Sequence, residues 1–246
     1  MPIEIVVEAI LFVLSEGCSW RAISQPAANW NSIYKYYRRW CKDGLWDKVW
    51  QQVAPAMKGS TLYLDATHMK VHRSGLNPAG GQETQALGLT KGGWNTKLHA
   101  AVDGAGVPQG LFLSGGNVAD VYHATEVLEE LTPKMVVADK GYDSDPLRIW
   151  LFERGVLPCI PPKANRIDPL PYRASAYRKR HLVENFFAHL KTFRRVATRY
   201  DKLAETFFGW VLLACIVKFG TGFTNTPYEL DLENVELEDV TPEGES

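Results

Sequence analysis

Four short apolar segments in the middle of the chain constrain the fold more than any other feature of the sequence. They span residues 61–65, 98–103, 107–113 and 134–139, and their apolar, β-branched and aromatic content is typical of strands. Gly104-Ala105-Gly106 joins the second segment to the third and is a hairpin signal. Helical patterns follow at 144–154, around Glu184 and at 202–219, with a short strand-like segment at 157–160. Strands first and helices afterwards predict an α/β fold whose sheet has a long antiparallel portion.

Three helical patterns precede these strands, at residues 3–14, 32–43 and 45–53. Five of the eight tryptophans lie in this first fifth of the chain, as expected where a small domain needs large side chains to bury enough area. Residues 54–60 have the composition of a linker. We therefore predict a small all-helical N-terminal domain over residues 1–54 and a larger α/β domain over residues 61–222. The run YKYYRR at 34–39 interleaves aromatic and basic residues, which fits contact with DNA and equally fits short helices that bind none.

Charge is distributed unevenly along the chain. Residues 227–246 hold eight acidic residues and no lysine or arginine, so the formal net charge of -1 conceals a charge of +7 over residues 1–226, with 27 basic and 20 acidic residues. Between residues 163 and 202, eleven basic residues accompany three acidic ones, a density that would attract a polyanion if it lay on one surface. The acidic segment has the composition of a disordered tail.

Several classes of protein do not fit the sequence. The four cysteines show no C-x-x-C spacing, which excludes the usual zinc and disulfide frameworks. The apolar run at 207–216 is shorter than the ~20 residues that cross a bilayer, and the start lacks the basic segment of a signal peptide. The six glycines within 73–93 do not form the pattern G-x-x-x-x-G-K-[ST], so this region is predicted to be a mobile surface loop. We expect a cytoplasmic protein with no membrane partner.

The stretch YRKRHLVENFFAHLK at 177–191 predicts an amphipathic helix. At ~100° per residue, one face carries Tyr177, Arg180, Glu184 and Lys191. The other face is apolar and consists of Leu182, Val183, Phe186, Phe187 and Leu190. A solvated helix face usually mixes its charges in i,i+4 pairs, so a single carboxylate among cations indicates a metal ligand beside a phosphate-binding path. An ordinary surface helix gives the same pattern, and the helix alone does not decide between the two.

Two aspartates come directly after apolar segments, Asp65 after the first and Asp139 after the fourth. Side chains in this position lie where ligands of α/β proteins collect, although aspartate also ends strands for purely local reasons. With Glu184 they form a D, D, E series, and three converging carboxylates repel one another unless cations lie between them. Two-metal phosphoryl transfer uses this arrangement, with Mg²⁺ or Mn²⁺ ions ~3.5–4 Å apart. Asp143 and Asp145 lie nearby, but only Asp139 directly ends the segment.

The polar face of 177–191 matches the spacing Y-x2-R-x3-E-x6-K at every position. Further motifs follow the same order as in one known family: LDAT (64–67), GNVAD (116–120), VADKGYDSD (137–145), IPPKANR (160–166) and FRRVATRYDK (193–202). The N-terminal sequences WRAI and NWNSIY extend the similarity. On these motifs the chain resembles the insertion-sequence DDE transposases of the RNase H-like superfamily, most closely the insertion sequence five family, over roughly residues 5–222.

The resemblance implies an RNase H-like catalytic domain over 61–222, with a mixed sheet flanked by helices. It implies that Asp65, Asp139 and Glu184 are the catalytic carboxylates and hold two Mg²⁺ or Mn²⁺ ions. The expected DNA-binding residues are Tyr177, Arg180, Lys191, Arg194, Arg195 and Arg199. Asn117 and Asp120 match a recurrent family motif and are expected to have a supporting role.

The implied function is that of a DNA transposase. Such an enzyme cuts double-stranded DNA at the ends of an insertion sequence and joins the freed 3′-hydroxyl to target DNA. A homodimer on DNA is expected on family grounds, because two ends must be held together. Two alternatives stay open. One is an RNase H-like nuclease or resolvase that cuts without joining, and the other is a catalytically defective remnant that still binds element ends.

Overall fold

The computed structural model describes residues 1–23 and 29–220. The acidic segment 227–246, predicted to be disordered, lies outside these residues. The helices are α1 (Ile3–Glu16), α2 (Trp30–Lys42), α3 (Leu45–Val53), α4 (Ala124–Leu128), α5 (Asp145–Glu153), α6 (Ala174–Tyr177), α7 (His181–Leu190), α8 (Arg194–Ala197) and α9 (Ala204–Phe219). The strands are β1 (Thr61–Val71), β2 (Gly88–Thr90), β3 (Gly93–Val102), β4 (Pro108–Gly115), β5 (Met135–Val137), β6 (Leu157–Cys159) and β7 (Thr198–Arg199). The predicted strands and helices of this part of the chain are all present, with ends displaced by a few residues.

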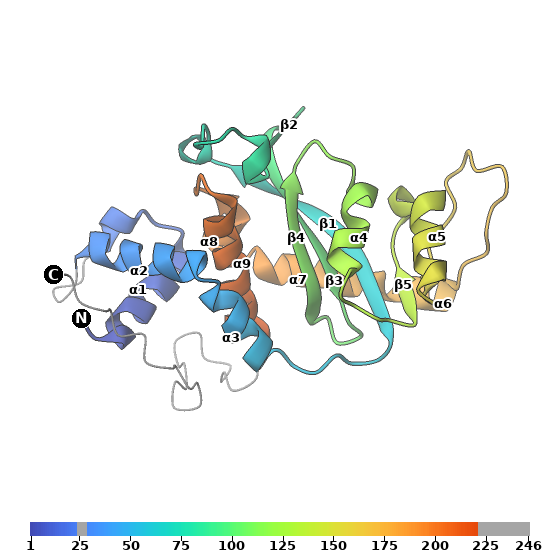
Figure 1. Cartoon of the computed structure of the whole chain (residues 1–246), viewed down its shortest axis with the longest axis horizontal. Coiled ribbons are helices and arrows are strands. Elements are labelled where there is room, and N and C mark those ends of the chain that lie inside the picture. Colours follow the sequence, from blue (N-terminus) through green and yellow to red (C-terminus); the bar gives the residue numbers. More distant parts are fainter. Residues whose placement is uncertain (24–28, 221–246) are drawn as a thin grey trace.

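Strand β1 lies at the centre of a mixed sheet. On one side β3 pairs with it antiparallel and β4 pairs with β3, which is the antiparallel portion that the sequence predicts. On the other side β5 runs parallel to β1, and β6 runs parallel to β5. Helices cover both faces of the sheet (Figure 1). The predicted architecture, an α/β fold with a mixed sheet flanked by helices and preceded by N-terminal helices, is confirmed.

Alternation along β1 divides the core between the two faces of the sheet. Leu62 and Leu64 pack with residues of α4 and α5, whereas Tyr63 and Met69 pack with residues of α7 and α9. Figure 1 shows α4 in front of the sheet and α7 behind it. Asp65 and Thr67 alternate with Leu64 and therefore face α7, on the same side as Tyr63.

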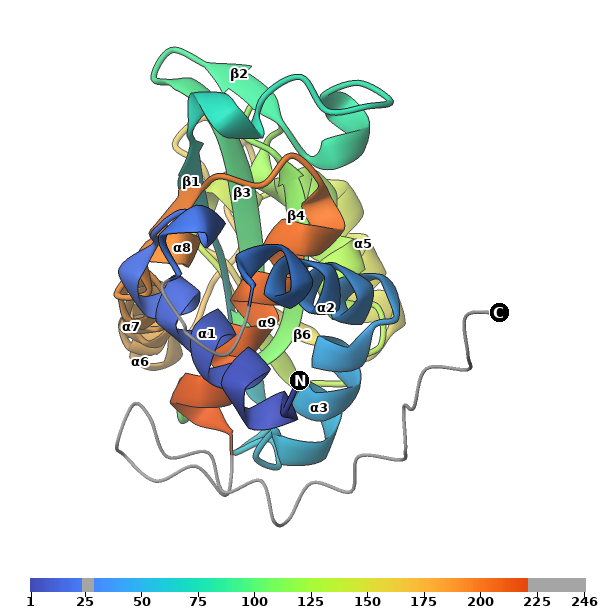
Figure 2. The same ribbon diagram turned by 90° about the vertical axis from the view of Figure 1, so that its left-hand side faces the viewer.

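The N-terminal helices share a core with the α9 side of the sheet. Helix α1 packs on α8, and α2 and α3 pack on α9; Figure 2 shows these helices gathered around α9. Tyr37 of α2 stacks on Trp210 of α9 with 4.0 Å between ring centroids, and its hydroxyl donates to the Thr206 carbonyl at 2.9 Å. The tryptophans Trp40, Trp46 and Trp50 are buried, which fits the structural use predicted for them. No helix in the described residues is both long and apolar enough to cross a membrane.

The turn between β3 and β4 shows why the glycine-rich sequence forms a hairpin there. The Asp103 carboxylate accepts hydrogen bonds from the backbone N–H groups of Ala105, at 2.8 Å, and Val107, at 3.0 Å. Gly106 has φ +80°, a conformation that a side chain disfavours. Aspartate and glycine together therefore fix the turn and, with it, the register of the antiparallel strands.

Three details differ from the expectations. Asp65 does not end its strand: β1 continues to Val71, because both β3 and β7 supply backbone partners beyond Asp65. The region 73–93 contains β2 and two 3₁₀ helices rather than only a loop, and Gly88 packs so tightly that an added Cβ would lie 2.0 Å from the Asn117 Oδ1 atom. The helical stretch around Glu184 is interrupted by a 3₁₀ turn, η6 (Arg178–Arg180), between α6 and α7.

Candidate active site

Two parallel neighbouring strands bring Asp65 and Asp139 together. Tyr63 on β1 is the register partner of Val137 on β5, and each aspartate lies two residues further along its own strand direction. Adjacent strands are ~4.8 Å apart, so the two carboxylates lie on one side of the sheet at the same level. The Asp139 carboxylate accepts a hydrogen bond from the Gly141 N–H at 2.7 Å, which fixes its position at the start of a 3₁₀ turn.

Helix α7 carries Glu184 to the same place. Its apolar side docks on the sheet as the sequence predicts, through the buried residues Val183, Phe186, Phe187 and Leu190. Arg180 then links the helix to β1: Nη1 donates to Asp65 Oδ2 at 2.7 Å, and Nη2 donates to Glu184 Oε1 at 2.5 Å. The structure thus gathers Asp65, Asp139 and Glu184 in one region, with the Arg180 guanidinium between two of them.

The electrostatics of this region favour an added cation. Burial raises the pKa of the Asp65 carboxyl; the Ala66 N–H and the charge of Arg180 oppose the rise, and Asp139 adds to it. A divalent ion would relieve this repulsion, and carboxylate oxygens are the donors that Mg²⁺ and Mn²⁺ prefer. In the described part of the chain, no three His, Cys, Asp or Glu side chains are already arranged around a metal position. The donor chemistry therefore fits a metal, provided that Arg180 releases the carboxylates it now bonds.

Lys191 contacts β1 near Asp65, and Tyr177 lies close to Arg180. The Lys191 ammonium donates to Thr67 Oγ1 at 2.6 Å, and Thr67 lies two residues from Asp65 on the same face of β1. Burial lowers the pKa of Lys191. Tyr177 stacks edge-on against Tyr172 with 5.5 Å between ring centroids. These groups form the rim of the site next to Glu184.

The last three expected DNA-binding residues have different environments. The Arg194 side chain is 71% exposed and pairs with Glu16 at 3.1 Å, so it remains available at the surface. Arg195 is buried and pairs with Asp201 at 3.1 Å. Arg199 is fully buried, and a role in DNA binding does not fit its position.

The surroundings of Arg199 explain this correction. Its guanidinium donates to the backbone carbonyls of Gln85, Asp201 and Lys202 at 2.8, 2.8 and 3.0 Å, and to Thr96 Oγ1 at 2.7 Å. Burial lowers its pKa to about 10, so it stays charged at neutral pH. Arg199 therefore ties the segment before α9 to the turn before β2 and to β3, and its role is structural.

Asp143 and Asp145 are engaged away from the three carboxylates, which supports the choice of Asp139. The buried Asp143 carboxylate receives hydrogen bonds from Arg148 and Arg166, both at 2.9 Å, and from the Lys163 N–H at 2.8 Å. Burial alone would raise the pKa of Asp143, but these donors outweigh it and lower the pKa. Asp145 pairs with Arg166 at the surface.

Two groups near the site were not singled out from the sequence. The buried Tyr142 hydroxyl has no hydrogen-bond partner among the described residues. Burial raises its pKa strongly, and the charges of Asp120, Asp65 and Asp139 raise it further. Lys97 is buried and donates to the Val118 carbonyl and to Asp120, both at 2.6 Å, which fits the supporting role expected for Asp120. A lysine inside a strand pattern gives no signal of such burial.

A mixed sheet with two aspartates and a glutamate in one region is the arrangement that the DDE resemblance leads one to expect. Comparison with known families agrees: the family described as "Transposase DDE domain" matches residues 57–217, and the family described as "Putative transposase of IS4/5 family" matches residues 2–55. The chain belongs to the transposase DDE domain family.

Individual relatives share this description. A "Putative transposase for insertion sequence element IS6501" from Brucella ovis is 35% identical over 124 residues, which cover 49% of this chain and 94% of that protein. A "Putative transposase for insertion sequence element IS402" from Burkholderia cepacia is 28% identical over 132 residues, 49% of this chain and 60% of that protein. Among solved structures, this chain is similar to the piggyBac transposase synaptic complex with hairpin DNA. The alignment covers 87% of this chain and 64% of the piggyBac chain, with a TM-score of 0.48 and 12% sequence identity.

Proposed function

We propose that this chain is an active DNA transposase that cuts the ends of an insertion sequence and joins them to target DNA. The observation that carries the proposal is the register of Asp65 and Asp139 on parallel strands, with Glu184 joined to Asp65 through Arg180. All three carboxylates are present and grouped, which argues against a remnant that binds DNA without cutting it.

Asp65, Asp139 and Glu184 are the residues that would hold divalent ions. When bound, such ions supply an activated water or hydroxyl nucleophile and stabilise the leaving oxygen. An ion would favour the charged form of Asp65, whose pKa is raised by burial and, to a smaller extent, by the charge of Asp139. Arg180 would act in both states of the site. In the present arrangement its guanidinium neutralises Asp65 and Glu184. Once ions replace it there, the guanidinium could donate hydrogen bonds to a DNA phosphate beside the carboxylates.

The remaining groups of the rim would hold DNA rather than react with it. Lys191 presents a point charge next to Thr67, and Tyr177 offers an aromatic edge beside Arg180. Arg194 extends the cationic surface beyond the end of α7. We propose that two copies act together, because joining both ends of an element to one target needs two such sites.

A strand-transfer assay tests the function directly. A labelled element-end duplex with a preformed 3′-hydroxyl is mixed with target plasmid and Mg²⁺, and joined products are separated by size. The wild-type protein is expected to cut an uncut end and to join the precut one. Cutting without joining would instead identify a nuclease or resolvase, and DNA binding with neither product would identify a remnant.

Lys191→Ala should weaken binding of element-end DNA by removing one phosphate contact. The expected loss is severalfold at low salt, and the slope of log affinity against log salt should fall by roughly 0.9, the value for one released counterion. Fluorescence anisotropy at a series of KCl concentrations measures both quantities.

Lys134→Ala is the matched control, because Lys134 is exposed at the start of β5, the opposite end of that strand from Asp139. Its affinity and salt slope should equal those of the wild type. An unchanged slope for Lys191→Ala would show that Lys191 serves only to hold α7 on Thr67.

A further inference from the structure

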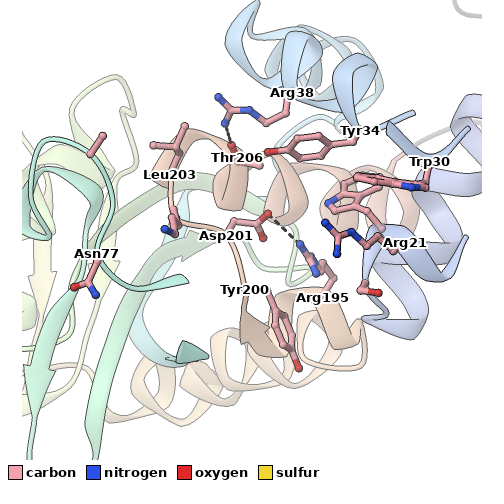
Figure 3. Close-up of a pocket in the computed structure, with 14 residues that line it drawn as sticks. Arg21, Trp30, Tyr34, Arg38, Asn77, Arg195, Tyr200, Asp201, Leu203 and Thr206 are labelled. Atoms are coloured by element: carbon pink, nitrogen blue, oxygen red, sulfur yellow. Dashed lines mark hydrogen bonds and ion pairs between the residues drawn. The ribbon is translucent and has the colours of Figure 1, made fainter. Parts of the chain in front are cut away.

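A second concave site lies between the N-terminal helices and the segment that leads into α9. It is a cavity of about 790 Å³, within the range of ligand-binding pockets. Figure 3 shows Trp30, Tyr34 and Arg38 of α2 lining it with Arg21, and Asn77 and Leu203 on the other side in this view. The lining also includes four residues of the segment between β1's partner strand β7 and α9 and of α8, namely Arg195, Tyr200, Asp201 and Lys202.

The pocket is separate from the catalytic carboxylates. Tyr200 packs on His72 with 4.9 Å between ring centroids. His72 follows β1 and lies seven residues after Asp65, which is ~23 Å along an extended chain. Bases in B-form DNA rise ~3.4 Å per step, so a duplex whose scissile phosphate lies at Asp65 could reach this pocket about seven base pairs away.

Flat aromatic rings and unneutralised cations line the pocket together. The Arg21 guanidinium lies 5.5 Å from the centroid of the Trp30 ring, and the Trp20 and Tyr34 rings are 5.4 Å apart. Arg21 and Lys202 are exposed and form no ion pair with another described residue. Aromatic faces accept a planar ring by stacking, and free cations accept a phosphate.

Two buried polar atoms in the lining point to a ligand with both a donor and an acceptor. Arg195 Nη2 bonds Asp201 Oδ1 at 3.1 Å, and these side chains are only 6% and 7% exposed. Arg195 Nε and Asp201 Oδ2 are nevertheless left without a hydrogen-bond partner among the described residues. Leaving such atoms unpaired is costly. Both atoms are buried as the side chains now lie. A nucleobase edge carries an N–H donor next to an acceptor and would satisfy both once the two side chains turn toward the pocket, whereas a bare phosphate would be repelled by Asp201.

From these observations we infer that the pocket binds one unpaired nucleotide of a DNA strand, with the base among Trp30, Tyr34 and Trp20 and the phosphate near Arg21 and Lys202. The inference rests on the proposed function in one respect, that DNA is the ligand of this chain. It adds a second anchoring point, built by the N-terminal helices, at a fixed distance from the cut.

The experiment compares two labelled duplexes of the same 20-base-pair sequence, one fully paired and one with a single extra thymidine. Affinities are measured by fluorescence anisotropy in EDTA, so that no cutting occurs. Wild-type protein should bind the bulged duplex roughly tenfold more tightly, the scale of one stacked base. Trp30→Ala and Arg21→Ala should each reduce the preference to less than about twofold, and Trp30→Phe should restore most of it.

Arg39→Ala is the matched control, because the Arg39 guanidinium also lies over an aromatic ring of α2, 5.0 Å from the centroid of Tyr36, but Arg39 does not line the pocket. Circular dichroism shows whether each variant is folded. Equal binding of both duplexes by the wild type, or an unchanged preference for the bulged duplex in Arg21→Ala, would each overturn the inference. These results do not depend on catalysis, so loss of strand transfer with an intact bulge preference would count against the proposed function alone.

Discussion

Alanine at Asp65, Asp139 or Glu184 is expected to lower Mg²⁺-dependent cleavage of an element end by on the order of 10³-fold or more, the scale for residues that act as a unit. Each substitution removes one of the carboxylates that would hold the divalent ions. The affinity for the same DNA in EDTA should change little, because no carboxylate favours a phosphate. Single-turnover cleavage of a labelled duplex measures the rates.

Asp145→Ala provides the control for these variants. Asp145 lies six residues after Asp139, and its side chain is 71% exposed and paired with Arg166 rather than with the three carboxylates. Its cleavage rate should stay within about threefold of the wild type. If Asp139→Ala cut DNA at the wild-type rate while Asp145→Ala did not, the second carboxylate of the site would have been assigned wrongly.

Stability measurements separate these losses from unfolding. The pKa of Asp65 is raised, so its charged form is disfavoured by the fold at neutral pH without metal. Removing this charge is therefore not expected to lower the midpoint of thermal unfolding in EDTA. A folded variant that does not cut would place the defect in the chemistry.

The sequence contained most of the information about the sheet and about Asp139. Strand-like segments of apolar residues and a Gly-Ala-Gly turn are local signals, and the turn forms through Asp103 and Gly106 as local chemistry requires. Asp139 lies two residues beyond the end of the short buried strand β5. Asp65 lies on the predicted strand but not at its end, because β1 continues to Val71 by pairing with β3 and β7. These partner strands are distant in sequence, so the local pattern around Asp65 carries no information about them.

The environments of individual arginines could not be obtained from the sequence. Arg194, Arg195 and Arg199 lie in one basic motif, yet only Arg194 is exposed. Arginine is rarely buried unless it is paired, and two of the partners of Arg199, Gln85 and Thr96, are more than one hundred positions away in the sequence. The pocket beside Arg195 could not be predicted from the sequence either, because its walls combine the N-terminal helices with the segment before α9, which is distant in sequence. The alternation of aromatic and basic residues at 34–39 was compatible with a binding face on α2 and equally with none.

Arg199→Ala should therefore unfold the protein more readily instead of weakening its contact with DNA. The substitution leaves the carbonyls of Gln85, Asp201 and Lys202 and the hydroxyl of Thr96 without their buried donor. Removing one partner from such a buried, charged network costs about 3–5 kcal/mol of unfolding free energy. For a chain of this length that corresponds to a fall of roughly 10 °C in the unfolding midpoint, which calorimetry or circular dichroism can measure.

Two further variants distinguish a structural Arg199 from a DNA-binding one. Arg199→Lys keeps the charge but not the several fixed donors of the guanidinium, so it should lose a large part of the same stability. Arg194→Ala removes an exposed arginine five residues away and should leave the midpoint within about 2 °C. If Arg199→Ala instead kept the wild-type midpoint and lost DNA affinity with a reduced salt slope, Arg199 would contact DNA after all. The network around its guanidinium argues for the opposite result, because a fully buried side chain that already donates to four groups inside the protein cannot reach a phosphate outside it.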